Sequence, residues 1–348
     1  MISTTTLRRR PADSVGIDDV AAFAGVSPST VSNVLNHPER VSPSTQEKVR
    51  RAIAVLRYVP NGAARSLAAG GSRTVGLALS DLGNSLFVDI AQGAETHAGE
   101  LGASVILANS GGELERERRA LAVFEQSLVL GSLLTLNDAQ HFRAIASRAQ
   151  GRTPLVMLNY HDTSAQFCSA FIDNAFGGQL ATKHLLDQGR RRLVFVGGPA
   201  SLQPVADRRD GFLRALAEVR LAPVDAVQPD WINRADGWNV GRSLAPRVAA
   251  GEIDGVVAAS DLLAAGILQA FAESPAISLP DDVSVIGYDN NQAAWDAPVP
   301  LSTISQPGEE LGATGIRLLM QELEDADHEH EAVRLVPTLV ERRSTQRG

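Results

Sequence analysis

From Arg73 onward, short apolar runs alternate with amphipathic stretches of helical period. The apolar runs are TVGLALS, ASVILA, GSLLTL, PLVML, SAFI, RLVFVG, GVVAAS and DVSVIGYD, and the helical stretches include LERERRALAVFEQSL, GGQLATKHLLDQ and DRRDGFLRALAEV. Continuous apolar strands separated by helices are typical of parallel sheets that are buried on both faces. These strand–helix units are too many for one small sheet, so the pattern predicts two α/β lobes.

Polar or aromatic residues, and in one case two glycines, follow most of these predicted strands. They are Ser80 and Asp81, Asn109 and Ser110, Asn159 and Tyr160, Gly197 and Gly198, Ser260 and Asp261, and Tyr288 and Asp289. In open parallel sheets, ligands bind beyond the carboxyl ends of the strands. The sequence therefore predicts a ligand site in a cleft between the two lobes.

A second pattern lies near the N-terminus, in the window 17–36, IDDVAAFAGVSPSTVSNVLN. Ala21, Gly25 and Val31 provide a small residue for close helix packing, a residue that tolerates positive φ in the turn, and a β-branched core residue. Ser27 can cap the second helix, and Pro28 suits its first position. This spacing indicates a DNA-reading helix-turn-helix, and the alternative is an ordinary helical hairpin with a glycine turn.

Hydrogen-bonding side chains gather on the expected second helix, where they can reach base edges and phosphates. They are Ser27, Ser29, Thr30, Ser32, Asn33 and Asn36. The next segment, VSPSTQEKVRRAIAVLRYVP, repeats the serine-proline helix start and predicts a third helix. Together these helices are expected to form a DNA-binding domain over 17–60.

The charge distribution agrees with nucleic-acid binding by the head. Residues 1–73 contain ten Lys and Arg against five Asp and Glu, a net charge of +5. Because the whole chain has a net charge of −8, residues 74–348 carry −13. A basic head on an acidic body attracts nucleic acid through the head alone. Residues 1–16 are expected to form a disordered basic arm, and no apolar run follows them, so no signal peptide is expected.

Other classes of protein find little support in the sequence. No apolar stretch approaches the roughly 20 residues of a membrane span, and a lone cysteine, Cys168, fits a buried strand residue in a reducing, cytoplasmic protein. The chain has no phosphate loop and no GxSxG, so neither an enzyme nor a cofactor is expected. His328 and His330 lie in the acidic stretch EDADHEHE, which is expected to be a solvated loop rather than a metal site.

On several of these runs the chain resembles bacterial transcription repressors of the lactose/galactose repressor family, from about 17 to 344. The supporting runs include DVAAFAGVSPSTVSNVLN, IDNAFGGQLATKHLLDQGRRRLVFVGGP, DVSVIGYDN, PLSTISQP and LVPTLVERRST. The resemblance implies an N-terminal all-α helix-turn-helix head, a hinge helix over 61–72, and an α/β two-lobed core similar to periplasmic binding proteins over 73–348. The N-lobe would hold about 74–172 and 308–325, and the C-lobe about 173–303 and 333–343.

The resemblance also implies DNA contacts. Ser29 and Asn33 match base-reading positions, although many relatives have Arg where Asn33 stands, and Asn favours adenine where Arg favours guanine. Leu67 matches a hinge leucine that wedges into the minor groove, and Asn61 and Ala64 lie in the same hinge. Because the hinge is too short to hold a helix alone, it is expected to be mobile in the free protein and ordered on the operator.

The resemblance further implies a ligand site in the cleft. The matching residues are Asp81, Phe87, Asn159, Tyr160, Arg208, Trp231, Asp261 and Asp289. Carboxylates, amides and an arginine beside flat aromatic faces suit a sugar. Purine-binding relatives carry an extra Arg and Thr before the matching arginine, where this chain has Leu202 and Pro204, so a nucleobase is less expected.

We therefore expect a dimeric, ligand-controlled repressor that binds a palindromic operator and responds to a small sugar-like effector. The alternatives are a nucleobase- or phosphosugar-responsive regulator of the same architecture, and an exported solute-binding protein without DNA function. No heptad repeat follows the last predicted strand, so a tetramerising coiled coil is not expected.

Overall fold

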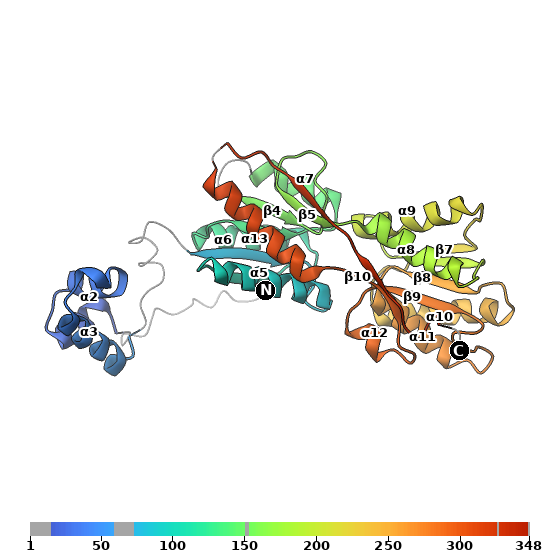
Figure 1. Cartoon of the computed structure of the whole chain (residues 1–348), viewed down its shortest axis with the longest axis horizontal. Helices are drawn as coiled ribbons and strands as arrows, with labels where there is room; N and C mark the ends of the chain where they lie inside the picture. Colours follow the sequence, from blue (N-terminus) through green and yellow to red (C-terminus); the bar gives the residue numbers. More distant parts are fainter. Residues whose placement is uncertain (1–14, 59–72, 150–152, 326, 347–348) are drawn as a thin grey trace, which may run out of the picture. The chain divides into compact units, whose positions relative to one another are not determined.

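The computed structural model describes residues 15–58, 73–149, 153–325 and 327–346 (Figure 1). The chain divides into two compact units, Met1–Ser72 and Arg73–Gly348. The expected hinge, with Asn61, Ala64 and Leu67, lies outside the described residues, as does the expected arm up to residue 14. Gly16 was expected in that arm, yet it is the N-cap of the first helix, and Val15 packs against the same core.

The described part of the first unit contains three α-helices, α1 (Ile17–Ala24), α2 (Pro28–Asn36) and α3 (Pro43–Leu56), with one 3-10 turn at Pro38–Arg40. Gly25 ends α1 in the left-handed region, at φ 66°. Ser27 caps α2 by accepting a hydrogen bond from the Thr30 N–H at 3.2 Å. The buried core consists of Val20, Ala21, Val31, Val34, Val49 and Ala52. Packing and caps therefore agree with the predicted helix-turn-helix.

The second unit contains two six-stranded sheets, one in each lobe. In the N-lobe the strand order is β2-β1-β3-β4-β5-β11, and all neighbours pair in parallel. The strands are β1 (Thr74–Leu79), β2 (Ser104–Asn109), β3 (Ser132–Thr135), β4 (Leu155–Leu158), β5 (Ser169–Ile172) and β11 (Ala332–Leu335). The helices are α5 (Ser85–Glu100), α6 (Leu114–Gln126), α7 (Ala139–Ala149) and α13 (Gly308–Glu324).

Helices cover both faces of the N-lobe sheet. Leu77 and Leu133 belong to the core cluster that includes α5 and α13, whereas the next residues, Ala78 and Leu134, belong to the cluster that includes α6 and α7. Successive strand residues point to opposite faces of a sheet. Each continuous apolar run therefore contributes side chains to two cores, one on each face of the sheet. This confirms the prediction of a parallel sheet that is buried on both faces.

In the C-lobe the strand order is β7-β6-β8-β9-β10-β12, and only β12 among these strands runs antiparallel to its neighbour. The strands are β6 (Leu193–Val196), β7 (Asp225–Val227), β8 (Gly255–Ala258), β9 (Ser284–Asp289), β10 (Ser302–Ser305) and β12 (Thr338–Val340). The helices are α8 (Asn174–Asp187), α9 (Gln203–Glu218), α10 (Arg234–Ala249), α11 (Asp261–Ala272) and α12 (Gln292–Asp296).

The chain passes between the lobes three times, from β5 to α8, from β10 to α13 and from β11 to β12 (Figure 1). The last passage corrects the expectation that 333–343 belongs to the C-lobe. Ala332–Leu335 pairs with β5 in the N-lobe, and Thr338–Val340 pairs with β10 in the C-lobe. Pro337 lies between them and has no N–H to continue a ladder, so the strand breaks there and changes sheet.

Candidate functional site

A cavity of about 550 Å³ lies between the N-lobe and the C-lobe. Residues at the carboxyl ends of strands form much of its lining, including Ser80 after β1, Asn137 after β3, Asn159 after β4 and Ser260 after β8. Asp289 ends β9 and also lines the cavity. The cavity is therefore at the edge of both sheets where ligands of parallel α/β proteins bind.

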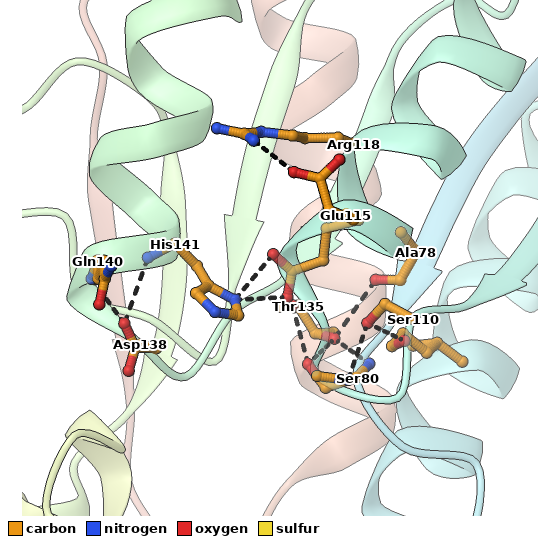
Figure 2. A network of polar contacts seen from close by, with 12 residues as sticks. Ala78, Ser80, Ser110, Glu115, Arg118, Thr135, Asp138, Gln140 and His141 are labelled. Atoms are coloured by element: carbon orange, nitrogen blue, oxygen red, sulfur yellow. Dashed lines mark hydrogen bonds and ion pairs between the residues drawn. The ribbon is translucent and has the colours of Figure 1, made fainter.

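Hydrogen bonds fix the N-lobe wall of the cavity (Figure 2). The Ser80 N–H donates to Thr135 Oγ1 at 2.7 Å, and the Ser80 hydroxyl donates to the Thr135 carbonyl at 2.9 Å. These bonds join the ends of β1 and β3. His141 Nδ1 lies 3.0 Å from a carboxylate oxygen of the buried Glu117, whose pKa burial raises and His141 lowers. These contacts within the N-lobe hold the wall of the cavity in place.

Arg208 lines the cavity from α9 and is almost fully buried. Its Nε donates to Asn174 Oδ1 at 2.8 Å, its Nη1 to the Ala259 carbonyl at 2.5 Å, and its Nη2 to Gln306 Oε1 at 3.4 Å. The guanidinium also stacks on the Tyr288 ring, 3.7 Å from the centroid. A guanidinium has five N–H donors, so these three bonds leave donors for a ligand.

Asp289 lies opposite Arg208, with Oδ1 3.7 Å from Arg208 Nη1. Its carboxylate accepts hydrogen bonds from Gln306 Nε2 at 2.6 Å and from Asn84 Nδ2 at 3.1 Å. Burial raises the pKa of Asp289 to about 6, although Arg208, Asn84 and Gln306 favour the charged form. Because Asn84 belongs to the N-lobe, its bond to Asp289 links the two lobes across the cavity.

Asn159 lines the cavity and has one side-chain atom without a hydrogen-bond partner in the described part of the chain. Its backbone is in the left-handed region at φ 59°, and its Nδ2 donates to Asn137 Oδ1 at 2.7 Å. Its Oδ1 is buried and has no hydrogen-bond partner among the described residues. A buried polar atom without a partner is costly, so the carboxamide of Asn159 is only partly satisfied by the protein itself.

Six of the eight residues predicted for the ligand site line the cavity, namely Asp81, Phe87, Asn159, Arg208, Trp231 and Asp289. They differ in exposure: Phe87 is buried, whereas Trp231 is 71% exposed and lies at the rim. The Asp81 carboxylate accepts from the Gly83 N–H at 2.7 Å in the loop after β1.

The structure places Tyr160 and Asp261 away from the cavity lining. Tyr160 is buried and stacks on Phe142 with ring centroids 5.0 Å apart, inside the N-lobe core. Asp261 is fully buried and accepts from the Thr303 hydroxyl at 2.7 Å and the Asn291 N–H at 2.9 Å. Burial, and then the nearby Asp289, raise the pKa of Asp261. Each side chain is instead held inside its own lobe, Tyr160 by Phe142 and Asp261 by Thr303 and Asn291.

The sequence reasoning missed several polar lining residues, namely Asn84, Asn137, Asp138, His141 and Asp230. Asn137 and Asp138 follow the run GSLLTL, so the rule about strand ends could have found them. Asn84 lies in a loop and caps α5 by accepting from the Leu86 N–H at 3.0 Å. Only the tertiary structure shows that Asn84 also reaches Asp289.

The predicted base-reading helix, α2, presents polar side chains on its surface. Ser27, Ser29 and Asn33 are exposed, and Thr30, Ser32 and Asn36 are half-buried. The Ser27 hydroxyl is 2.8 Å from the Ser29 and Thr30 hydroxyls, and Asn36 Nδ2 donates to Ser32 Oγ at 3.3 Å. Val31 and Val34 face the core. The opposite, polar face is the one that a helix-turn-helix inserts into the major groove.

A helix-turn-helix unit followed by a two-lobed unit with an interlobe cavity defines the class of DNA-binding regulators that carry a ligand-binding core. Residues 16–61 match the family described as bacterial regulatory proteins, lacI family, and residues 182–345 match the periplasmic binding protein-like domain. The chain belongs to the lacI family and is a DNA-binding transcriptional repressor of it. Members of this family are transcription regulators and not enzymes.

Relatives cover nearly the whole chain. The HTH-type transcriptional repressor PurR of Vibrio parahaemolyticus serotype O3:K6 is 32% identical over 336 residues, which are 95% of this chain and 98% of that repressor. PurR of Photobacterium profundum is 31% identical over 339 residues, 95% and 98% of the two chains.

Solved structures agree over the same length. The lac repressor dimer bound to operator and the anti-inducer ONPF superposes with a TM-score of 0.83 at 28% identity, covering 95% of this chain and 99% of that one. The complex of the transcriptional regulator CelR with cellobiose gives a TM-score of 0.70 at 29% identity, with the same coverage. Within the described residues, no helix combines the length and hydropathy needed to span a bilayer.

Proposed function

We propose that this repressor binds a small, neutral, polyhydroxylated effector such as a sugar in the interlobe cavity, and that the effector controls its affinity for operator DNA. The observation that carries this proposal is the cavity itself, which is set between the lobes and is lined by carboxylates, amides and the buried Arg208 beside aromatic rings. Its volume of about 550 Å³ falls in the range of small-molecule sites. The proposed ligand contacts are Asp81, Phe87, Asn159, Arg208, Trp231 and Asp289, together with Asn84, Asn137, Asp138 and Asp230.

The charge of the lining favours a neutral effector over a phosphorylated one. Four carboxylates line the cavity, from Asp81, Asp138, Asp230 and Asp289, against the single arginine Arg208. A phosphate would meet like charges there, whereas sugar hydroxyls can donate to carboxylates in charge-assisted hydrogen bonds. The phosphosugar alternative is therefore the weaker one.

A nucleobase is the second candidate effector. The aromatic rings of Phe87 and Trp231 could cover a base as well as the apolar face of a sugar, and the curated relatives are repressors named PurR. Against this, Leu202 and Pro204 line the cavity with apolar groups that offer no base edge a hydrogen bond. The complex of the related CelR with cellobiose is in keeping with a sugar.

A thermal-shift panel of neutral sugars, sugar phosphates and nucleobases tests the proposal. A ligand that binds only the folded state raises the melting temperature by mass action, and we expect this from a neutral sugar. Trp231→Ala should remove the shift, whereas Trp295→Ala, which also removes an exposed tryptophan but outside the cavity lining, should keep it. A shift produced by nucleobases alone would overturn the sugar assignment.

On the DNA side, we propose that the polar face of α2 reads the two halves of a palindromic operator from a homodimer. The proposed contacts are Ser27, Ser29, Thr30, Ser32, Asn33 and Asn36, with Asn61, Ala64 and Leu67 of the hinge. Exposed apolar side chains on the edge strand β2 support dimer formation: Ile106 is 43% and Leu107 is 51% exposed. An edge strand with exposed apolar side chains is a typical site of contact with another chain.

A further inference from the structure

Away from the cavity, three metal-ligating side chains meet at the edge of the N-lobe sheet. Cys168 directly precedes β5, and His328 and His330 precede β11, which pairs in parallel with β5. The Cys168 Sγ lies 2.9 Å from His328 Nε2, although the two residues are 160 apart in sequence, and 3.7 Å from His330 Nδ1. The segment expected to be a solvated loop therefore folds back onto a buried thiol.

The ligand atoms of the three side chains are close together. Their ligand atoms all lie within 4.8 Å of one another. Zinc bonds of about 2.3 Å to sulfur and about 2.0 Å to nitrogen put the two atoms roughly 3.6 Å apart in a tetrahedral site. The contact with His330 already has this separation, and the contact with His328 requires an opening of less than about 1 Å.

The surroundings provide a carboxylate as well. Glu322 lies in the last turn of α13, and its Oε2 is buried without a hydrogen-bond partner among the described residues. Burial raises the pKa of Glu322, and the two imidazoles, His330 and His328, act to lower it. Glu322 is not among the residues whose ligand atoms lie within 4.8 Å of one another, so the candidate ligands are Cys168, His328 and His330.

We propose that Cys168, His328 and His330 bind one Zn²⁺ ion per chain. One sulfur and two imidazole nitrogens select zinc over Mg²⁺ and Ca²⁺, which prefer oxygen ligands. The thiol proton leaves to solvent as the zinc–sulfur bond forms. The ion joins the starts of β5 and β11, two strands that lead into crossovers between the lobes.

The test uses the full chain, reduced and freed of metal with a chelator, and then dialysed against Zn²⁺ or Co²⁺. We expect one bound ion per chain, and with Co²⁺ a charge-transfer band from the thiolate. His328→Gln should weaken zinc binding by at least roughly 100-fold, because even the loss of an outer partner costs 10–100-fold. His97→Gln is the matched control, since His97 pairs with Glu100 on α5 and not with this cluster.

Cys168→Ser should abolish the charge-transfer band. Because Cys168 is fully buried, this variant could be unfolded, so a melting curve without metal must first show a cooperative transition. His328 is half-buried, so the result for His328→Gln does not depend on this melting curve. Absence of stoichiometric zinc in the wild-type chain, or zinc binding that His328→Gln leaves unchanged, would overturn the proposal.

Discussion

At the scale of single residues, the cavity depends on which of two neighbouring side chains faces it. Asn159 lines the cavity while Tyr160 enters the N-lobe core. Ser260 lines it while Asp261 binds Thr303 and Asn291 inside the C-lobe. Asp261 is thus a positioning residue, which holds the loop after β9 close to the cavity.

The buried carboxyl of Asp289 should make stability depend on pH. Its pKa is about 6 in the folded chain and near 3.8 ordinarily, so the folded state holds its proton more tightly. Its contribution to stability is fully present below about pH 4 and is lost as the pH rises through about 6, by an amount of order 3 kcal/mol.

Asp289→Asn removes this titration. We expect the free energy of unfolding of the variant, relative to wild type, to increase as the pH rises from 4 to 7, whatever constant cost the amide brings. Urea unfolding at several pH values measures the difference. A difference that stays constant with pH would contradict the raised pKa.

Asn33 should set base choice in the operator. It is exposed on α2, and a bidentate contact from Asn to adenine contributes about 1–3 kcal/mol of discrimination. Asn33→Ala should therefore relax selection at one position of each half-site and leave non-specific binding nearly unchanged. Selection from a random DNA pool shows this directly, and an unaltered consensus would place Asn33 outside the base contacts.

At the scale of elements, glycines bring helices into backbone contact. A Cβ on Gly312 of α13 would meet the Ile90 carbonyl oxygen of α5 at 2.0 Å, and one on Gly93 of α5 would meet the Glu309 carbonyl oxygen of α13 at 1.9 Å. The pairs α8 with α9 and α10 with α11 cross in the same way, at Gly178 and Gly237 among others. Each lobe therefore relies on close helix pairs next to its sheet.

Gly312→Ala should destabilise the core because α5 and α13 must separate to admit the methyl group. Overpacking of this kind costs about 1–3 kcal/mol. Gly99→Ala, also on α5 but with open space at its Cβ, should be neutral or stabilising, since alanine favours helix by up to about 1 kcal/mol. Denaturant unfolding compares the two variants, and equal stabilities would refute the close crossing.

At the scale of the whole ligand-binding unit, hydrogen bonds link the lobes around the cavity. Asn84 donates to Asp289, and the Gln203 N–H donates to the Asn137 carbonyl at 2.7 Å. The His161 N–H donates to Gln203 Oε1 at 2.9 Å. An effector that contacts both lobes competes with or adds to these bonds, and it shifts the lobe arrangement by its differential affinity for the two states.

The proposed dimer makes operator affinity depend on β2. Leu107→Glu places a charge on the exposed edge strand, and burying that charge at an interface would cost several kcal/mol, so we expect monomers and weak operator binding. Light scattering after size-exclusion chromatography measures the mass. Val219→Glu, at a residue that is 49% exposed beyond α9, is the control, and a dimeric Leu107→Glu variant would move the interface elsewhere.

The sequence alone determined what depends on neighbouring residues: the caps and turn of the helix-turn-helix, the alternation that makes two mainly parallel sheets, and the strand ends that line the cavity. Periodicity, Gly25 and Ser27 act within a few residues, so they can be recognised without coordinates. Short or mixed strands such as β7 and β10 lack a long apolar run and were not recognised by this pattern.

Only the tertiary structure decided which side chains meet from distant parts of the chain. It placed Ala332–Leu335 beside β5, turned Asp261 into the C-lobe, joined Asn84 to Asp289, and brought His328 to Cys168. Each of these depends on strand pairing and lobe packing between residues far apart in sequence. Local periodicity carries no information about such pairings, because it repeats identically whichever strand lies alongside.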